Sequence, residues 1–158
     1  MPKLASELKN ELRVFAASRM DLVAFYERKG QFETAYLARW AILEKFVKAV
    51  VAEYRRDQLK ASLREWLEYA RRKQPRKPAR SPETSMEVRH LPERTEFVRA
   101  LNYFEFDGRR LWSVMGATAK PRGFRNQIAH TGRRFTKELQ YRKLSKLLSD
   151  VTAKSLGR

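Results

Sequence analysis

The stretch FETAYLARWAILEKFVKAVV, residues 32–51, decides the fold class. Its large apolar side chains recur at alternating steps of four and three residues, a pattern continued just beyond it: Tyr36, Trp40, Leu43, Val47, Val50 and Tyr54. Such steps place every member on one face of an α-helix. After Arg55-Arg56-Asp57 the pattern resumes with Leu59, Leu63, Trp66 and Ala70. The spacing predicts helix from about 32 to 72, either as one long helix or as two with a break near Asp57.

The segments on either side are also helical in pattern. Residues 3–29 carry Leu8, Leu12, Phe15, Leu22 and Tyr26 on one predicted face, and Gly30 is a suitable helix end. Residues 93–104 form a helix through Phe97, Leu101 and Phe104, and residues 109–119 form another through Leu111, Trp112 and Met115. Asp107-Gly108 between them is a turn signal.

The C-terminal third predicts two further helical segments. Lys120-Pro121-Arg122-Gly123 is expected to break the helix, and a short segment from Phe124 to Thr131 then ends at Gly132. The last helix spans about 135–153, with Tyr141, Leu144, Leu148 and Val151 facing inward. No strand pair or internal repeat is evident. We therefore expect one all-α domain over residues 1–158, a bundle of four main antiparallel helices plus short helical pieces.

The composition narrows the class of partner. The chain has 158 residues, 35 Lys and Arg against 18 Asp and Glu, a net charge of +17 and no cysteine. Such an excess attracts polyanions, and nucleic acid is the first expectation, ahead of an anionic membrane. The sequence has no run of 18 apolar residues and no pattern of a secretory signal, so we expect a cytoplasmic protein without a membrane span. Without cysteine, disulfides and thiolate metal sites are excluded.

A basic, proline-rich connection is predicted at about residues 71–92. It holds four prolines and, between residues 71 and 80, six basic residues and no acid: Arg71, Arg72, Lys73, Arg76, Lys77 and Arg80. Proline disfavours helix, so we expect an exposed, mobile connection. Two interpretations stay open: an arm that follows an RNA backbone, or a solvated linker kept extended by its charge.

The segment FRNQIAH, residues 124–130, holds the candidate chemistry. Histidine as a residue type exchanges protons near neutral pH, and arginine is a permanent donor that suits phosphate oxygens. Asn126 and His130 are four residues apart and share a helix face, but Arg125 and His130 are about 140° apart. They can meet one ligand if Arg125 lies in a frayed first turn, or if two copies enclose the ligand. The alternative is a core His130 and an unremarkable surface Arg125.

Arg125, Asn126 and His130 resemble the R-x-x-x-x-H signature of the HEPN superfamily, and residues 32–51 resemble its early helix ending in a Leu-Glu pair. HEPN domains are helical bundles that dimerise around a composite cleft, and many are metal-independent endoribonucleases of toxin–antitoxin, abortive-infection and CRISPR-linked defence. The resemblance implies that Arg125 binds the scissile phosphate, His130 transfers protons and Asn126 shapes the site. It also implies a homodimer, a 2′,3′-cyclic phosphate product, no cofactor or metal, and a possible inhibitor or larger defence complex as partner.

Some features depart from that family or leave its function open. One toxin branch has a tyrosine two residues after the histidine, where this chain has Gly132, so we do not expect its adenylylation switch. We expect Glu44 to be a solvated helix residue rather than a partner of Arg125. The region from Lys120 to Lys146 has nine basic residues and one acid, and we expect Lys120, Arg122, Arg133 and Arg134 to contact RNA. The chain is therefore either an endoribonuclease or a non-catalytic, basic RNA-binding subunit of a larger ribonucleoprotein. A third option, an interaction domain, would use Trp40, Trp66 and Trp112 only for packing and dimerisation.

Overall fold

The computed structural model describes residues 2–73 and 88–157, and these residues form six helices without a strand. Three helices are long: α1 (Ser6–Arg28), α2 (Phe32–Lys73) and α6 (Glu138–Leu156). Three are shorter: α3 (Arg94–Tyr103), α4 (Gly108–Met115) and α5 (Lys120–Thr131). The prediction of an all-α bundle is confirmed. No helix in these two ranges is both long enough and apolar enough to span a membrane.

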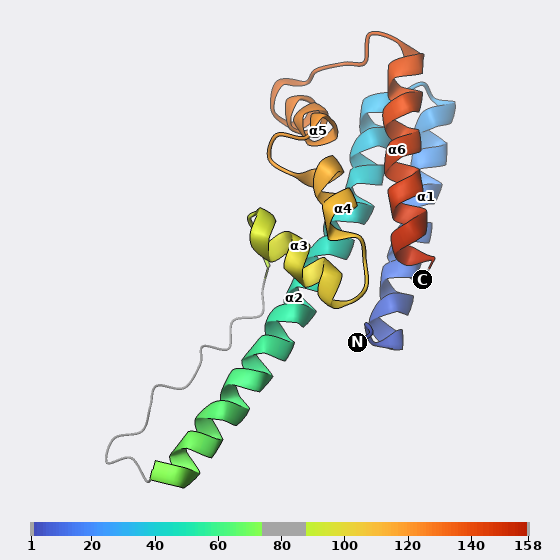
Figure 1. Ribbon diagram of the computed structural model, residues 1–158. Helices are drawn as coiled ribbons and strands as arrows, with labels where there is room; N and C mark the ends of the chain where they lie inside the picture. The colour runs from blue at the N-terminus through green and yellow to red at the C-terminus, as the bar shows by residue number, and fades with distance from the viewer. Residues whose placement is uncertain (1, 74–87, 158) are drawn as a thin grey trace.

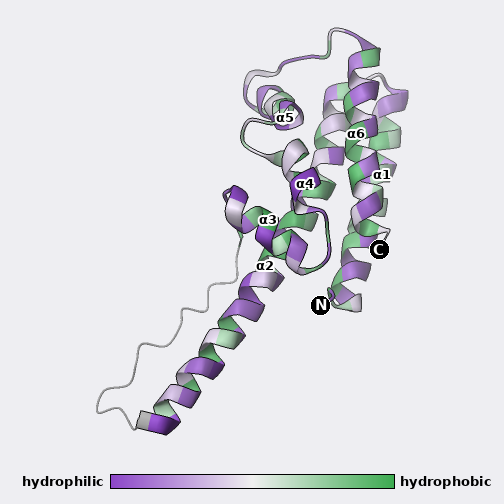
Figure 2. Cartoon of the chain, viewed as in Figure 1, coloured by the Kyte–Doolittle hydropathy of each residue, from purple (hydrophilic) through white to green (hydrophobic). Residues whose placement is uncertain are grey.

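Helix α2 is the central element, and it is one continuous helix of 42 residues, about 63 Å long. It packs against α1, α3, α5 and α6. Figure 1 shows α1 running antiparallel to it after the tight turn at Gly30, whose φ is +68°, and α6 lying beside both. The second half of α2 leaves the bundle as a projecting rod, on which polar residues alternate with apolar ones (Figure 2).

The predicted apolar stripe of α2 is its buried face. Tyr36, Trp40, Leu43, Val47 and Val50 are at most 2% exposed. The buried surface also includes Ala35, Ile42, Phe46 and Val51, because neighbouring helices contact α2 on more than one side. Beyond Tyr54 the stripe loses its cover, and Leu63 and Leu67 are exposed.

Most other predicted core positions are also confirmed. The inward faces of α3 and α6 are buried as expected, and so is Phe104 just after α3. The predicted positions that are buried on the two helices are Phe97, Leu101, Tyr141, Leu144, Leu148 and Val151. On α1 the prediction for Leu22 is wrong: Leu22 is exposed and Val23 is buried. Eleven residues are close to three full turns, so Val23 shares the face of the buried Leu12, and Leu22 falls outside it.

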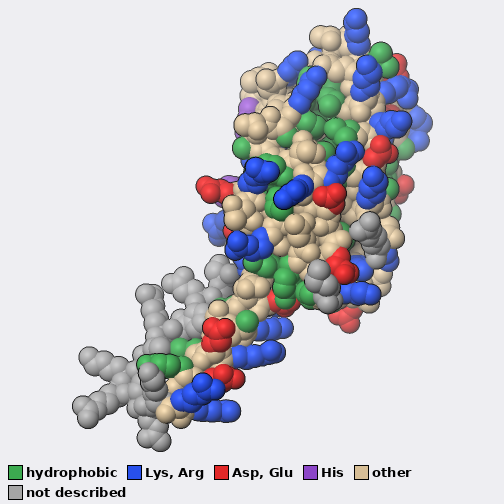
Figure 3. Space-filling model, viewed as in Figure 1, with side chains coloured by type: hydrophobic (Ala, Val, Ile, Leu, Met, Phe, Trp, Pro, Cys, Tyr) green, Lys and Arg blue, Asp and Glu red, His purple; other side chains and the backbone are tan. Residues whose placement is uncertain are grey.

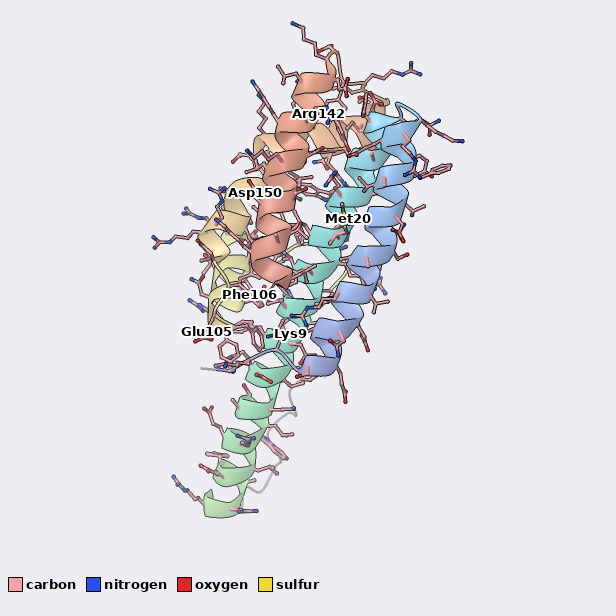
Figure 4. The ribbon with its side chains drawn as sticks, turned by 90° about the vertical axis from the view of Figure 1, so that its right-hand side faces the viewer. Lys9, Met20, Glu105, Phe106, Arg142 and Asp150 are labelled. Carbon is pink, nitrogen blue, oxygen red and sulfur yellow. The ribbon has the colours of Figure 1, made fainter. Side chains whose placement is uncertain are left out.

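A turn at residues 104–107 joins α3 to α4 beside the start of α1. Figure 4 labels Glu105 and Phe106 in this turn and Lys9 on α1, and these three residues line one shallow hollow. Asp107 accepts a hydrogen bond from the backbone N–H of Arg110 at 3.0 Å and thereby caps α4. The predicted helix at 109–119 is shorter than expected, since α4 ends at Met115.

Two glycines offer a matched pair of stability predictions. A Cβ at Gly108 would lie 2.7 Å from the carbonyl oxygen of Val98, so Gly108→Ala must separate α3 from α4. We expect that overpacking to cost about 1–3 kcal/mol. A Cβ at Gly123 meets nothing within 4 Å, and alanine is the better helix former by up to about 1 kcal/mol. In urea unfolding Gly108→Ala should lower the midpoint and Gly123→Ala should keep or raise it. Equal effects would contradict the close approach of α3 and α4.

A polar cluster joins the three long helices. Glu27 of α1 accepts hydrogen bonds from Arg39 of α2 at 2.9 Å and from the hydroxyl of Tyr141 of α6 at 2.6 Å. Burial by itself would raise the pKa of Glu27, but these two donors outweigh it and lower the pKa below its ordinary value of 4.5. The ionised carboxylate therefore stabilises the folded chain more than the unfolded one.

The lowered pKa of Glu27 predicts a loss of stability in acid. Its contribution is fully present above the unfolded-state pKa and disappears as the pH falls through the lower folded-state pKa. The free energy of unfolding of wild type should therefore fall more steeply below about pH 4.5 than that of Glu27→Gln. Urea midpoints at a series of pH values measure this difference. Parallel curves for the two proteins would show that Glu27 does not contribute.

Candidate functional site

Helix α5 carries the three motif residues, and it begins earlier than predicted. Lys120-Pro121-Arg122-Gly123 is its first turn and does not break the helix, so that prediction is wrong. Proline is tolerated in a first turn because its missing N–H would have no helical partner there. Arg125 is therefore the sixth residue of a regular helix, and a frayed first turn cannot bring it to His130. Gly132 ends α5 as predicted, with a left-handed φ of +67°.

Contacts with α2 hold α5 in place at both ends. The buried hydroxyl of Tyr36 donates to the carbonyl oxygen of Pro121 at 2.7 Å. The carboxylate of Glu33 accepts from the backbone N–H of Phe135 at 2.7 Å, just after the C-terminal end of α5. Phe124 and Ile128 are buried between these anchors. Their shared face fixes the rotation of α5 about its axis and hence the directions of the motif side chains.

Arg125 is held by two oxygens. Its Nη1 donates to Oδ1 of Asn126 at 3.0 Å, and its Nη2 lies 3.7 Å from Oε2 of Glu44 on α2. About a third of the Arg125 side chain is exposed. Arginine has five N–H donors, so these contacts leave donors that can reach a ligand oxygen at the surface. The site therefore presents an arginine whose direction is fixed before a ligand arrives.

The prediction that Glu44 is a solvated residue without a role at Arg125 is wrong. Glu44 accepts from the indole N–H of Trp40 at 3.1 Å and forms an ion pair with Lys48 at 2.7 Å, besides facing Arg125. Burial would raise its pKa, but the hydrogen bond and charge of Lys48, with Arg125 and Trp40, lower it below the ordinary value. Glu44 is thus an ionised anchor for the arginine.

His130 lies apart from Arg125, near the C-terminal end of α5. Its side chain is exposed, so the alternative of a core histidine is wrong. It is not among the residues lining the pocket that contains Arg125 and Asn126. Five residues of regular helix separate Arg125 from His130 by about 140°, and a single chain therefore points them in different directions.

The remaining predicted RNA-binding residues fall into separate groups. Arg122 is close to Arg125, and Lys120, Arg133 and Arg134 are exposed at the two ends of α5. Arg133 stacks its guanidinium over the ring of Phe124 at 4.2 Å. Arg71 and Arg72 are exposed near the end of α2, about 40 Å along that helix from Glu44. The backbone of α2 ends at Lys73, while Arg76, Lys77 and Arg80, like most of the proline-rich connection, lie outside the described residues.

Sequence reasoning missed a second segment at the Arg125 pocket. Arg89 and His90, which precede α3, line it together with Glu44, Arg122, Arg125 and Asn126. His90 is exposed, as predicted for a surface residue, but its place beside Arg125 was not foreseen. Only a tertiary contact joins residues 35 positions apart, and no local spacing signals it. Within residues 2–73 and 88–157, no group of three or more His, Cys, Asp or Glu side chains is arranged to hold a metal ion.

Comparison of the chain with protein-family models, curated proteins and solved structures finds no match.

Proposed function

We propose that this chain is a metal-independent endoribonuclease of the HEPN type, acting on single-stranded RNA or tRNA in a toxin–antitoxin, abortive-infection or CRISPR-linked defence system. The observation that carries the proposal is the pairing on one helix of an arginine oriented by Glu44 and Asn126 with an exposed histidine. These are the two groups that phosphodiester cleavage without a metal needs: a fixed cation for the phosphate and a group that moves protons.

The reaction uses a nucleophile that RNA itself supplies. The 2′-hydroxyl oxygen forms a bond to phosphorus as it gives up its proton, and the bond from phosphorus to the 5′-oxygen breaks as that oxygen gains a proton. The products are a 2′,3′-cyclic phosphate end and a 5′-hydroxyl end. Arg125 would stabilise the negative charge on the phosphate oxygens. His130 would transfer protons to or from the reacting oxygens.

A homodimer completes this site. Since one α5 directs Arg125 and His130 about 140° apart, a single protomer does not offer both to one phosphate. Two copies of α5 that face each other across a cleft supply an arginine from one subunit and a histidine from the other. The position of Arg125 inside a regular helix supports this arrangement over a frayed first turn.

The proposal predicts cleavage in the presence of a chelator. Purified protein with single-stranded RNA and EDTA should give fragments with 2′,3′-cyclic phosphate ends, detected by their resistance to ligation until the cyclic phosphate is removed. Fragments with 3′-hydroxyl ends, or full inhibition by EDTA, would contradict the mechanism.

The charge distribution favours a second candidate, a non-catalytic RNA-binding subunit. Figure 3 shows Lys and Arg side chains scattered across the face in view, with fewer Asp and Glu among them. A net charge of +17 spread in this way binds a phosphate backbone without any reaction. Under this candidate the chain binds RNA, leaves it intact, and does not depend on His130.

A further inference from the structure

The pocket beside Arg125 is lined by further basic side chains that are not part of the Arg125–His130 motif. It has a volume of about 160 Å³ and is lined by Glu44, Arg89, His90, Arg122, Arg125 and Asn126, among others. Pockets for drug-sized ligands start at about 300 Å³, so this one suits a single small group. Three separate parts of the chain meet in it: α2, the segment before α3, and α5.

The charge of the pocket is positive. Three guanidinium groups and one carboxylate line it, and that carboxylate is also paired with Lys48 at 2.7 Å. Arg122 donates to the carbonyl oxygen of Met115 at 3.2 Å, a neutral acceptor that fixes its direction without cancelling its charge. Guanidinium groups brought together in this way repel one another, and an anion between them offsets the repulsion. Planar arginine donors match the oxygens of a phosphate.

We propose that this pocket binds one phosphate group of a nucleic acid within a single protomer, with Arg89 and His90 contacting it from the segment before α3. The proposal deepens the proposed function, since it names residues that hold the RNA, but it does not require that the RNA be cleaved. It also assigns a role to both histidines of the chain: His90 contacts phosphate in the pocket, and His130, which does not line the pocket, is the proton-transfer group of the proposed cleavage.

The two histidines allow a direct test by NMR. In the full-length His130→Gln protein the one remaining imidazole signal belongs to His90. Inorganic phosphate added at fixed pH should shift this signal with saturation, whereas chloride at equal ionic strength should not. In a His130→Gln background, Arg122→Gln should weaken the phosphate affinity at least tenfold. The matched control is Arg110→Gln, which removes an arginine from a different pocket of about 350 Å³ and should leave the affinity unchanged.

Equal shifts with phosphate and chloride, or equal affinities of the Arg122 and Arg110 variants, would overturn the proposal. A second pair of probes identifies the source of the phosphate. The probes are a deoxydinucleotide with a 5′-phosphate and the same molecule without it. If the pocket binds internal phosphates, both molecules shift the His90 signal. If it binds only terminal phosphates, the molecule without a 5′-phosphate leaves the signal unchanged. Saturable binding without RNA cleavage would reject the endoribonuclease and keep the pocket. RNA cleavage without a phosphate-dependent shift of the His90 signal would keep the endoribonuclease and reject the phosphate pocket.

Discussion

The His130→Ala variant is expected to cleave single-stranded RNA about 10²–10⁴ times more slowly than wild type, because positioned general acid–base groups contribute factors of that size. His130 is exposed, so its removal leaves no cavity in the core and should not change the unfolding midpoint. The measurement is the single-turnover cleavage rate in EDTA, with RNA affinity measured in parallel. Loss of rate at unchanged affinity assigns the histidine to the chemical step.

The neighbouring Thr131→Ala is the matched control for this loss. The Thr131 hydroxyl donates back to the carbonyl oxygen of Gln127 at 2.6 Å, so this change alters the same turn of α5 without touching the imidazole. We expect its cleavage rate to stay close to that of wild type. If His130→Ala retains the wild-type rate, or if Thr131→Ala loses as much activity, His130 is not the proton-transfer group and the binding subunit becomes the better account.

Periodicity predicted the core well where packing follows a simple helix face. The stripe from Tyr36 to Val50 is buried because α2 is long and surrounded, and the face of α6 from Tyr141 to Val151 is buried for the same reason. Leu22 shows the limit of the method. Leu22 and Val23 are both apolar. To decide which of them is buried, the rotation of about 100° per residue has to be summed along the helix from Leu12, and a pattern of local steps does not do this.

The errors at α5 arose from treating proline and glycine as breaks. Pro121 lies in the first turn, where a missing N–H costs nothing, and Gly123 is helical because the surrounding turns hold it. Local spacing did not favour the ion pair of Glu44 with Arg125 and did not signal the place of His90 in the same pocket. Both depend on the tertiary fold, and the default expectation for a charged or polar residue is exposure to solvent.

The affinity for single-stranded RNA is expected to fall about 100-fold between 50 and 200 mM salt. Each phosphate neutralised on a single strand contributes about 0.7 to the slope of log affinity against log salt. Five basic residues lie on α5 and directly after it: Lys120, Arg122, Arg125, Arg133 and Arg134. Contacts from all five give a slope near −3.5, and a fourfold rise in salt then lowers affinity by about two orders of magnitude.

The slope also separates the cations at α5 from those elsewhere on the surface. Arg134→Gln, measured in a His130→Ala background to prevent cleavage, should make the slope shallower by about 0.7. Arg109→Gln on α4 changes the net charge equally at an exposed position outside α5 and should leave the slope unaltered. Identical slopes for these two variants would mean that RNA affinity depends on the net charge of the whole surface and not on contacts at α5, because the two changes alter the net charge equally at different places. A slope near zero would exclude a phosphate backbone as the ligand of α5.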